Sequence, residues 1–180
     1  MRKLLYTLLV GLIGAGIVHI TVLLLLPSFS ERDAWSRLAE ASDFYKAVRV
    51  DDGDGTQPLV KAVDPLFHAA ACRFDLDDGP VHIRAPGNVP FWSVSLYDRA
   101  GQNVYSFNDR ATGMGALDFV VLTSAQMIEV RKQVPDKYKR SVFVQTSLGE
   151  GIGVVRVFVP DPTWEEATSN FLARISCTKD

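Results

Sequence analysis

Side chains that could contact a ligand gather between residues 91 and 110, in the segment FWSVSLYDRAGQNVYSFNDR. In an extended strand the side chains alternate, so Trp92 would point to one face and Tyr97 to the other. Polar residues end the segment, where side chains and free backbone groups could meet a small molecule. One interpretation is a hairpin whose aromatic rings fill a core, with an Asp–Arg pair closing the loop. The other is a ligand- or partner-binding site made by Trp92, Tyr97, Asn108, Asp109 and Arg110.

The histidines and the acidic loops give only weak signals for a metal site. His68 and His82 fall in neighbouring expected strands, but no third ligand accompanies them, and neither HExxH nor CxxC occurs. The acidic loops at 51–55 and 75–79 lack the glycine and the glutamate that a calcium loop requires. We therefore expect ordinary sheet histidines, turns, and no metal.

Catalytic motifs are absent from the sequence. The glycines between residues 149 and 153 lie between two expected strands, whereas a dinucleotide-binding loop precedes a helix. There is no phosphate-binding lysine loop and no GxSxG elbow. We expect no cofactor, and we consider an enzyme less favoured than a binding protein.

A membrane-spanning segment is the strongest signal. Residues 4–26, LLYTLLVGLIGAGIVHITVLLLL, carry no charged side chain. As a helix they would rise about 34 Å, enough to cross a hydrocarbon layer of about 30 Å. A cleaved signal peptide would have a shorter apolar run and small residues at its end. We therefore expect a retained anchor over residues 1–27 and an exported domain over residues 28–180.

The flanking charges predict the orientation of this segment. Arg2 and Lys3 precede it, which predicts a cytoplasmic N-terminus in the bacterial inner membrane and a periplasmic C-terminal domain. A stripe of small residues could seat another helix, and a mid-membrane histidine is costly unless it has a partner. The alternative is a lipid-facing anchor whose histidine bonds a backbone carbonyl. The residues of this expected helix contact are Gly11, Gly14, Ala15 and His19.

Beyond the anchor the chain is mildly acidic, with 17 basic and 21 acidic residues and a net charge of −4. This argues against nucleic acid and against a domain lying flat on anionic lipid. Both cysteines, Cys72 and Cys177, lie in this exported part. An oxidising compartment favours a disulfide between them, and the alternative is two separate buried thiols.

The hydrophobic pattern predicts mostly strands. A short amphipathic helix begins at Ser30, with an inner face of Trp35, Leu38, Ala41 and Tyr45. Another follows from Ser124 to Val134, and Asp161-Pro162 opens a last one with the inner stripe Trp164, Thr168, Phe171, Leu172 and Ile175. Strands are expected at 66–76, 80–85, 91–98, 103–108, 117–123, 141–147 and 153–159, the last two as a closing hairpin. The class is α+β, an antiparallel sheet or sandwich flanked by short helices.

A resemblance to a known family rests on CRFDL…DGPV and WSVSLYD. The chain resembles, from Asp64 to Phe171, the bacterial family labelled domain of unknown function 1254, and it is most similar to its short, membrane-anchored members. In longer members this domain is joined to a second β-rich domain of unknown function, so the resemblance implies a separate β-rich companion protein here. The Asn-Asp-Thr-Tyr-like segment of the longer members is absent before the first matched strand. The resemblance brings no catalytic residues.

Three functions follow in order of preference. The first is an anchored interaction domain, a subunit of an envelope complex or a homo-oligomer. The second is a domain that binds a small ligand or an envelope lipid. The third is a hydrolase whose residues come together only in the fold.

Overall fold

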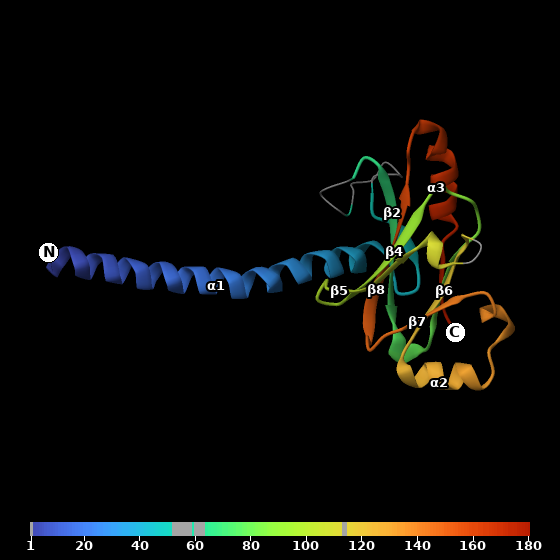
Figure 1. The fold of residues 1–180 in the computed structure, drawn as a ribbon, viewed down its shortest axis with the longest axis horizontal. Coiled ribbons are helices and arrows are strands. Elements are labelled where there is room, and N and C mark those ends of the chain that lie inside the picture. Colours follow the sequence, from blue (N-terminus) through green and yellow to red (C-terminus); the bar gives the residue numbers. More distant parts are fainter. Residues whose placement is uncertain (1, 52–58, 60–63, 113–114) are drawn as a thin grey trace.

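Two β-sheets packed face to face form the folded domain, and a long helix leaves it on one side (Figure 1). The computed structural model describes residues 2–51, 59, 64–112 and 115–180, and for residues 26–33 only the backbone. The expected loop at 51–58 lies outside the described residues apart from Asp51. The class is α+β, as the sequence predicts, with two sheets in a sandwich.

The larger sheet, sheet A, is antiparallel throughout, in the order β1-β2-β8-β4-β5. The long central strands β2 and β8 pair over nine residues, from Phe67↔Phe158 to Asp75↔Glu150. The strands of sheet A are β1 (Ala47–Arg49), β2 (Phe67–Asp75), β4 (Trp92–Asp98), β5 (Asn103–Asn108) and β8 (Glu150–Phe158).

The smaller sheet, sheet B, has the order β7-β6-β3-β9, and its β6–β7 pair is parallel. Its strands are β3 (Val81–Ala85), β6 (Leu117–Leu122), β7 (Val142–Gln145) and β9 (Ser176–Lys179). The edge strand β9 follows the last helix and was not expected, because its four residues SCTK lack a strand pattern of their own. It carries Cys177, and the structure joins Cys177 to Cys72 of β2, with Cα atoms 6.6 Å apart. The expected disulfide therefore links the two sheets.

Helices cover the outer faces and one end of the sandwich. They are α1 (Arg2–Ala41), α2 (Ser124–Lys132) and α3 (Glu165–Ala173), with single 3₁₀ turns η1 (Leu76–Asp78), η2 (Asp109–Ala111), η3 (Asp136–Tyr138) and η4 (Pro162–Trp164). Helix α2 packs on the outer face of sheet B through Met127. Its N-cap is Thr123, which forms a capping box with Gln126, so the expected cap at Ser124 is wrong by one residue. Asp161 is an N-cap, as expected, but it caps the 3₁₀ turn η4, which begins with Pro162, and α3 follows only from Glu165.

The main core lies between the sheets and is completed by two α3 residues, Phe171 and Leu172. Strand β4 shows the period-two pattern that the sequence predicts, with alternate residues fully buried and half-buried. The largest fully buried side chains include Trp92, Phe74 and Phe119.

Helix α1 is a single helix of 40 residues, not a membrane segment followed by a separate helix. The expected helix start at Ser30 is therefore wrong, because the backbone there is already helical. Proline removes one helical N–H, which favours a break but does not require one. The expected contact residues Trp35 and Leu38 do pack, on the outer face of β2 and β8. Tyr45, expected in the helix, lies beyond it with a left-handed backbone at φ 61°.

The expected closing hairpin of residues 141–147 and 153–159 is also wrong. Strand β7 pairs with β6 in sheet B, whereas β8 lies between β2 and β4 in sheet A. Gly151 and Gly153 belong to β8, where they leave room for neighbours. A Cβ on Gly151 would lie 2.7 Å from the Phe74 ring, and one on Gly153 would lie 3.1 Å from Ile83. The glycines therefore serve packing inside a strand.

Candidate functional site

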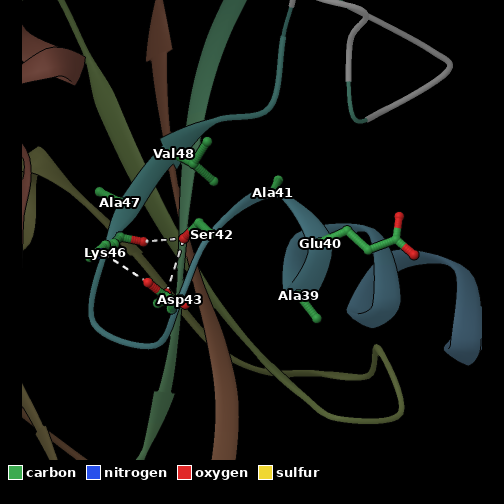
Figure 2. A pocket seen from close by; sticks show the side chains of 8 residues that line it. All are labelled: Ala39, Glu40, Ala41, Ser42, Asp43, Lys46, Ala47 and Val48. Carbon is green, nitrogen blue, oxygen red and sulfur yellow. Dashed lines mark hydrogen bonds and ion pairs between the residues drawn. The ribbon is translucent and has the colours of Figure 1, made fainter.

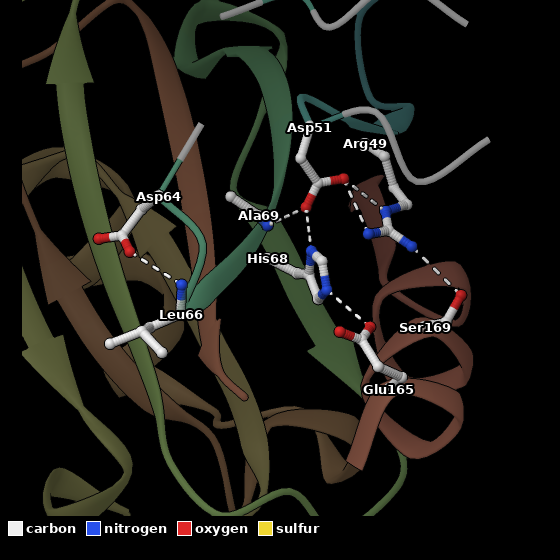
Figure 3. A network of polar contacts seen from close by, with 8 residues as sticks. All are labelled: Arg49, Asp51, Asp64, Leu66, His68, Ala69, Glu165 and Ser169. Carbon is white, nitrogen blue, oxygen red and sulfur yellow. Dashed lines mark hydrogen bonds and ion pairs between the residues drawn. The ribbon is translucent and has the colours of Figure 1, made fainter. Parts of the chain in front are cut away.

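A cluster of charged side chains lies where α3 crosses the β1–β2 edge of sheet A (Figure 3). Arg49 ends β1, Asp51 follows it, and His68 lies near the start of β2. Glu165 and Ser169 lie one turn apart at the start of α3. We call these five residues, Arg49, Asp51, His68, Glu165 and Ser169, the His68 clasp.

Asp51 is the centre of the clasp and is a buried carboxylate, with 7% of the residue exposed. Its Oδ1 accepts two hydrogen bonds from the Arg49 guanidinium, with both N–O distances 2.8 Å. Its Oδ2 accepts from the backbone N–H of Ala69 at 3.0 Å and lies 2.8 Å from His68 Nδ1. Arg49 and the Ala69 N–H therefore compensate this buried carboxylate with charge-assisted and backbone hydrogen bonds.

His68 lies between two carboxylates. Its Nδ1 contacts Asp51, and its Nε2 lies 2.8 Å from Oε2 of Glu165. The Glu165 side chain is 54% exposed, whereas that of His68 is 19% exposed. Arg49 also donates to Ser169 Oγ at 3.2 Å, so two contacts fasten the start of α3 to sheet A.

The clasp can hold a proton between its charged groups, but it is not arranged as a metal centre. Both ring nitrogens of His68 face a carboxylate, so neither has a lone pair directed at a shared open position. Among the described residues no three His, Cys, Asp or Glu side chains are placed to hold a metal ion. An Asp–His pair of this kind orients an imidazole and sets which nitrogen carries the proton.

A second polar cluster closes one end of sheet B. His82 of β3 is buried and its Nε2 lies 2.9 Å from Asp118 of β6. Ser141 donates to the same Asp118 oxygen, and its Oγ is 3.5 Å from His82 Nε2. Because the serine hydroxyl donates to the carboxylate, this trio is not a nucleophile with its base. His68 and His82 were expected in neighbouring strands, but β2 and β3 belong to different sheets.

Asp180 extends this second cluster at the C-terminal end of the described chain. Its carboxylate accepts from Tyr138 Oη at 2.7 Å and pairs with Lys137. Partial burial raises the pKa of Asp180, but the hydrogen bonds from Lys137 and Tyr138 outweigh it and lower that pKa below its usual value. Burial, followed by the bond to Asp180, raises the pKa of the Tyr138 hydroxyl.

The residues proposed from the sequence as a binding site fall in two places. Trp92 is buried in the core, and its Nε1 donates to the Gly115 carbonyl at 2.7 Å. Tyr97 lies near the other end of β4 and packs with the residues that receive α1. The structure therefore does not bring Tyr97 to the other four residues.

Asn108, Asp109 and Arg110 lie together at the end of β5. The Asn108 side chain caps the following turn by accepting from the Arg110 N–H at 3.1 Å. Arg110 is exposed. The Oδ1 atom of Asp109 is buried and has no hydrogen-bond partner among the described residues. A buried acceptor without a donor is uncommon, and it is the one sign of a ligand at these positions.

A surface hollow of about 440 Å³ lies where α1 ends and β1 begins (Figure 2). Lys46 spans it, with an ion pair to Asp43 at 2.8 Å, while Ser42 Oγ donates to the Lys46 carbonyl. The hydrogen bond from Lys46 lowers the pKa of Asp43. This hollow contains none of the residues proposed from the sequence; it is lined by Ala39, Glu40, Ala41, Ser42, Asp43, Lys46, Ala47 and Val48.

Comparison with known families decides where the chain belongs. A family model described as a protein of unknown function, DUF1254, matches residues 62–179, which include both sheets except β1. The chain belongs to the DUF1254 family. No curated protein matches this DUF1254 chain.

Two solved structures are similar to this DUF1254 chain. The VPA0106 protein from Vibrio parahaemolyticus has a TM-score of 0.59 and 11% identity, covering 84% of this chain and 35% of its own length. An uncharacterised protein from Burkholderia cenocepacia has a TM-score of 0.49 and 13% identity, covering 82% of this chain and 46% of its own. The first shows a shared fold. This chain spans less than half the length of either protein.

Sequence reasoning missed the His68 clasp. Asp51 and Glu165 lie 17 and 97 residues from His68, and no spacing rule connects residues so far apart. The clasp is built from three segments of the chain: the end of β1 with Asp51, the start of β2, and the start of α3. The sequence predicted the loop that begins at Asp51 and a helix that opens at Asp161, but not that they meet at β2. Only the packing of α3 on β1 and β2 brings them together.

Proposed function

We propose that this protein is a single-pass membrane protein whose exported domain is a subunit of an envelope complex. The observation that carries the proposal is helix α1, because one unbroken helix contains an exposed apolar segment at its start and a packed segment at its end. Such a helix anchors the domain and also fixes how it is presented to a partner.

The first part of α1 has the properties of a membrane span. Residues 2–25 contain an 18-residue window with a mean hydropathy of 2.5, and none of that window is buried against the domain (Figure 1). The hydroxyls of Thr7 and Thr21 donate to the carbonyls of Lys3 and Ile17. Hydroxyls satisfied within the helix suit a hydrocarbon environment, which offers no water.

The last part of α1 is mounted firmly on sheet A. Leu38 is buried there, and the Arg73 guanidinium of β2 lies 4.5 Å from the centre of the Phe44 ring and 5.4 Å from that of Trp35. Arg73 also donates to the Ser42 carbonyl at 2.8 Å. These contacts surround a buried cation with aromatic faces and a carbonyl, an arrangement that stabilises the helix end.

The geometry favours a protein partner over the lipid surface. From Leu25 to Trp35 a helix rises about 15 Å, so the domain would stand clear of the hydrocarbon layer. A signal peptidase would have to cut inside this continuous helix, which favours a retained anchor.

The cellular location follows from two further features. The disulfide supports an oxidising compartment, and Arg2 and Lys3 support a cytoplasmic N-terminus. These features favour the inner membrane of a bacterium, with the domain in the periplasm.

Purification in a mild detergent tests the proposal. The full-length chain, a chain beginning at Ser28 and the variant Gly11→Leu are tagged, purified and examined by mass spectrometry. We expect a protein partner in near-equal amount with the full-length chain, and its loss with the other two. Gly11→Leu would obstruct close approach of a second helix, whereas Ile13→Leu, on the opposite face, is the matched control.

His19 gives an independent check of the helix contact. We expect His19→Leu to lower cross-linking in the membrane while the domain stays folded. The substitution removes the polar contact that His19 would make with a second helix. Unchanged cross-linking in both Gly11→Leu and His19→Leu would contradict a specific helix contact.

A second candidate function is small-ligand or lipid binding, favoured by the Oδ1 atom of Asp109, which is buried and has no hydrogen-bond partner in the part of the chain that the structure describes. A ligand with a hydrogen-bond donor would satisfy this atom. In the same purification, a small molecule recovered with both the full-length chain and the chain beginning at Ser28, and lost with Asp109→Ala, would favour this function and would argue against the anchored subunit.

A further inference from the structure

We propose that the His68 clasp is a proton-controlled latch, in which a single proton fastens Glu165, the first residue of α3, to the edge of sheet A. When this proton leaves, Glu165 detaches and the Nε2 atom of His68 becomes accessible. The inference concerns a site apart from α1 and does not depend on the proposed anchoring function.

The proton count follows from the two contacts of His68. A neutral imidazole has one N–H, and an ionised carboxylate only accepts hydrogen bonds. Yet each ring nitrogen lies 2.8 Å from a carboxylate oxygen. The closed clasp therefore contains one proton more than a neutral imidazole and two carboxylates provide, whether that proton is on the ring or on Glu165. Without it, one ring nitrogen would face a carboxylate with lone pair against lone pair.

Glu165 is the arm that opens. Asp51 is buried and also accepts from Arg49 and from the Ala69 backbone, so it stays in place when the proton leaves. The Glu165 side chain is 54% exposed, and His68 is its partner in the clasp. Water can replace that one contact at little cost. The remaining His68–Asp51 bond then orients the ring, with Nδ1–H toward Asp51.

Among the described residues, Asp51 and Glu165 are the charged groups that His68 contacts. From β1 the charge that faces the clasp is Arg49, which is neutralised by Asp51. From β8 the residue opposite His68 is Val157, and Arg156 points to the other face of the sheet. From α3 only Glu165 contacts the ring among the described residues. An isolated imidazole changes its charge between about pH 5 and 8, so pH values at the two ends of this range test the latch.

Opening would be local. Phe171 and Leu172 keep the rest of α3 in the core, and Arg49 still reaches Ser169. The latch therefore controls the first turn of α3 and access to His68 without unfolding the domain. An exposed Nε2 beside an oriented ring is a competent base or hydrogen-bond acceptor.

Two variants of Glu165 distinguish a latch from a permanent contact. An amide donates as well as accepts, so Glu165→Gln can bond His68 whether or not the ring is charged. Glu165→Ala has no side-chain group that could contact His68 at any pH. Glu166→Gln changes a neighbouring exposed glutamate outside the clasp and is the matched control.

Hydrogen exchange of the full-length chain in detergent, at about pH 5.5 and pH 8 and corrected for intrinsic rates, measures the latch. In the wild type and in Glu166→Gln we expect protection of the first α3 amides to fall about fivefold at the higher pH, the size of one net hydrogen bond. Glu165→Gln should stay protected at both pH values and Glu165→Ala at neither. Equal wild-type protection at both pH values would overturn the proposal.

Chemical modification gives a second readout. Diethyl pyrocarbonate acylates uncharged, accessible imidazole nitrogens, and mass spectrometry separates peptides that carry His68 and His82. At pH 8 we expect His68 of the wild type to react several-fold faster than in Glu165→Gln and about as fast as in Glu165→Ala. His82, which is buried, is the internal reference. Equal reactivity of His68 in the wild type and Glu165→Gln would also overturn the latch.

Discussion

The ring of Phe74 occupies the space where a side chain on residue 151 would lie. A Cβ built on Gly151 would be 2.7 Å from Phe74 Cζ and 3.0 Å from the Tyr97 carbonyl oxygen. Phe74 is fully buried in β2, so it has little room to move. The pair holds β2 and β8 in close contact at the end of sheet A, where Phe74 and Gly151 are register partners.

Gly151→Ala should therefore destabilise the domain by about 1–3 kcal/mol, the usual cost of overpacking a filled core. Gly149→Ala is the matched control, because its Cβ would meet only Asp77 at 3.9 Å, an ordinary contact. Guanidinium unfolding of the full-length chain in detergent, followed by tryptophan fluorescence, measures both. Equal midpoints for the two variants would contradict the packing explanation.

Arg49→Ala should cost about 3 kcal/mol or more, because it leaves the buried Asp51 carboxylate without its guanidinium. The same unfolding experiment measures the loss. Arg156→Ala removes an exposed arginine from β8 and should change the free energy of unfolding by less than about 0.5 kcal/mol. Similar losses of unfolding free energy in both variants would contradict a stabilising role for the buried Arg49–Asp51 pair.

The stability of the domain should fall in acid partly through Asp180. The pKa of this carboxyl is lowered in the folded protein, so its contribution is present above the usual carboxyl range and is lost as pH falls through the folded value. Asp180→Asn should therefore be less stable at neutral pH and lose less stability between about pH 5 and pH 3. Thermal unfolding across this range measures the slope.

Asp136→Asn is the control for this acid effect, because Asp136 is exposed and its ion-pair partner among the described residues is Lys139, one turn away. A pH slope as steep in Asp180→Asn as in the wild type would show that other carboxyls account for the acid sensitivity.

The disulfide should contribute about 4–5 kcal/mol, because it closes a loop of 105 residues in the unfolded chain. The double variant Cys72→Ala, Cys177→Ala should unfold at a correspondingly lower denaturant concentration. Adding a reductant to the wild type should move its midpoint to the same place. The wild type is unfolded and refolded in the reductant so that the disulfide is reduced before its midpoint is measured. An unchanged midpoint would show that the disulfide does not stabilise the domain.

The sequence by itself determined the features that depend on local pattern. The apolar run of residues 4–26, the strand alternation around Trp92 and the cap at Asp161 all depend on neighbours within a few residues. These patterns predicted the α+β class, most of the strands, and the helices α2 and α3. The pairing of Cys72 with Cys177 followed from their number and compartment and needed no knowledge of the topology.

Tertiary structure decided the pairing of strands and the assembly of the sites. The glycines between residues 149 and 153 have the composition of a turn, but Gly151 and Gly153 lie inside β8, where Phe74 and Ile83 leave little space for a side chain. Trp35 and Leu38 have helical spacing, but this spacing does not reveal that they pack on β2 and β8 at the end of a 40-residue helix. His68 meets Asp51 and Glu165 through contacts between elements far apart in the chain. Local patterns do not contain such contacts, because they depend on which faces the sheets and α3 bury together.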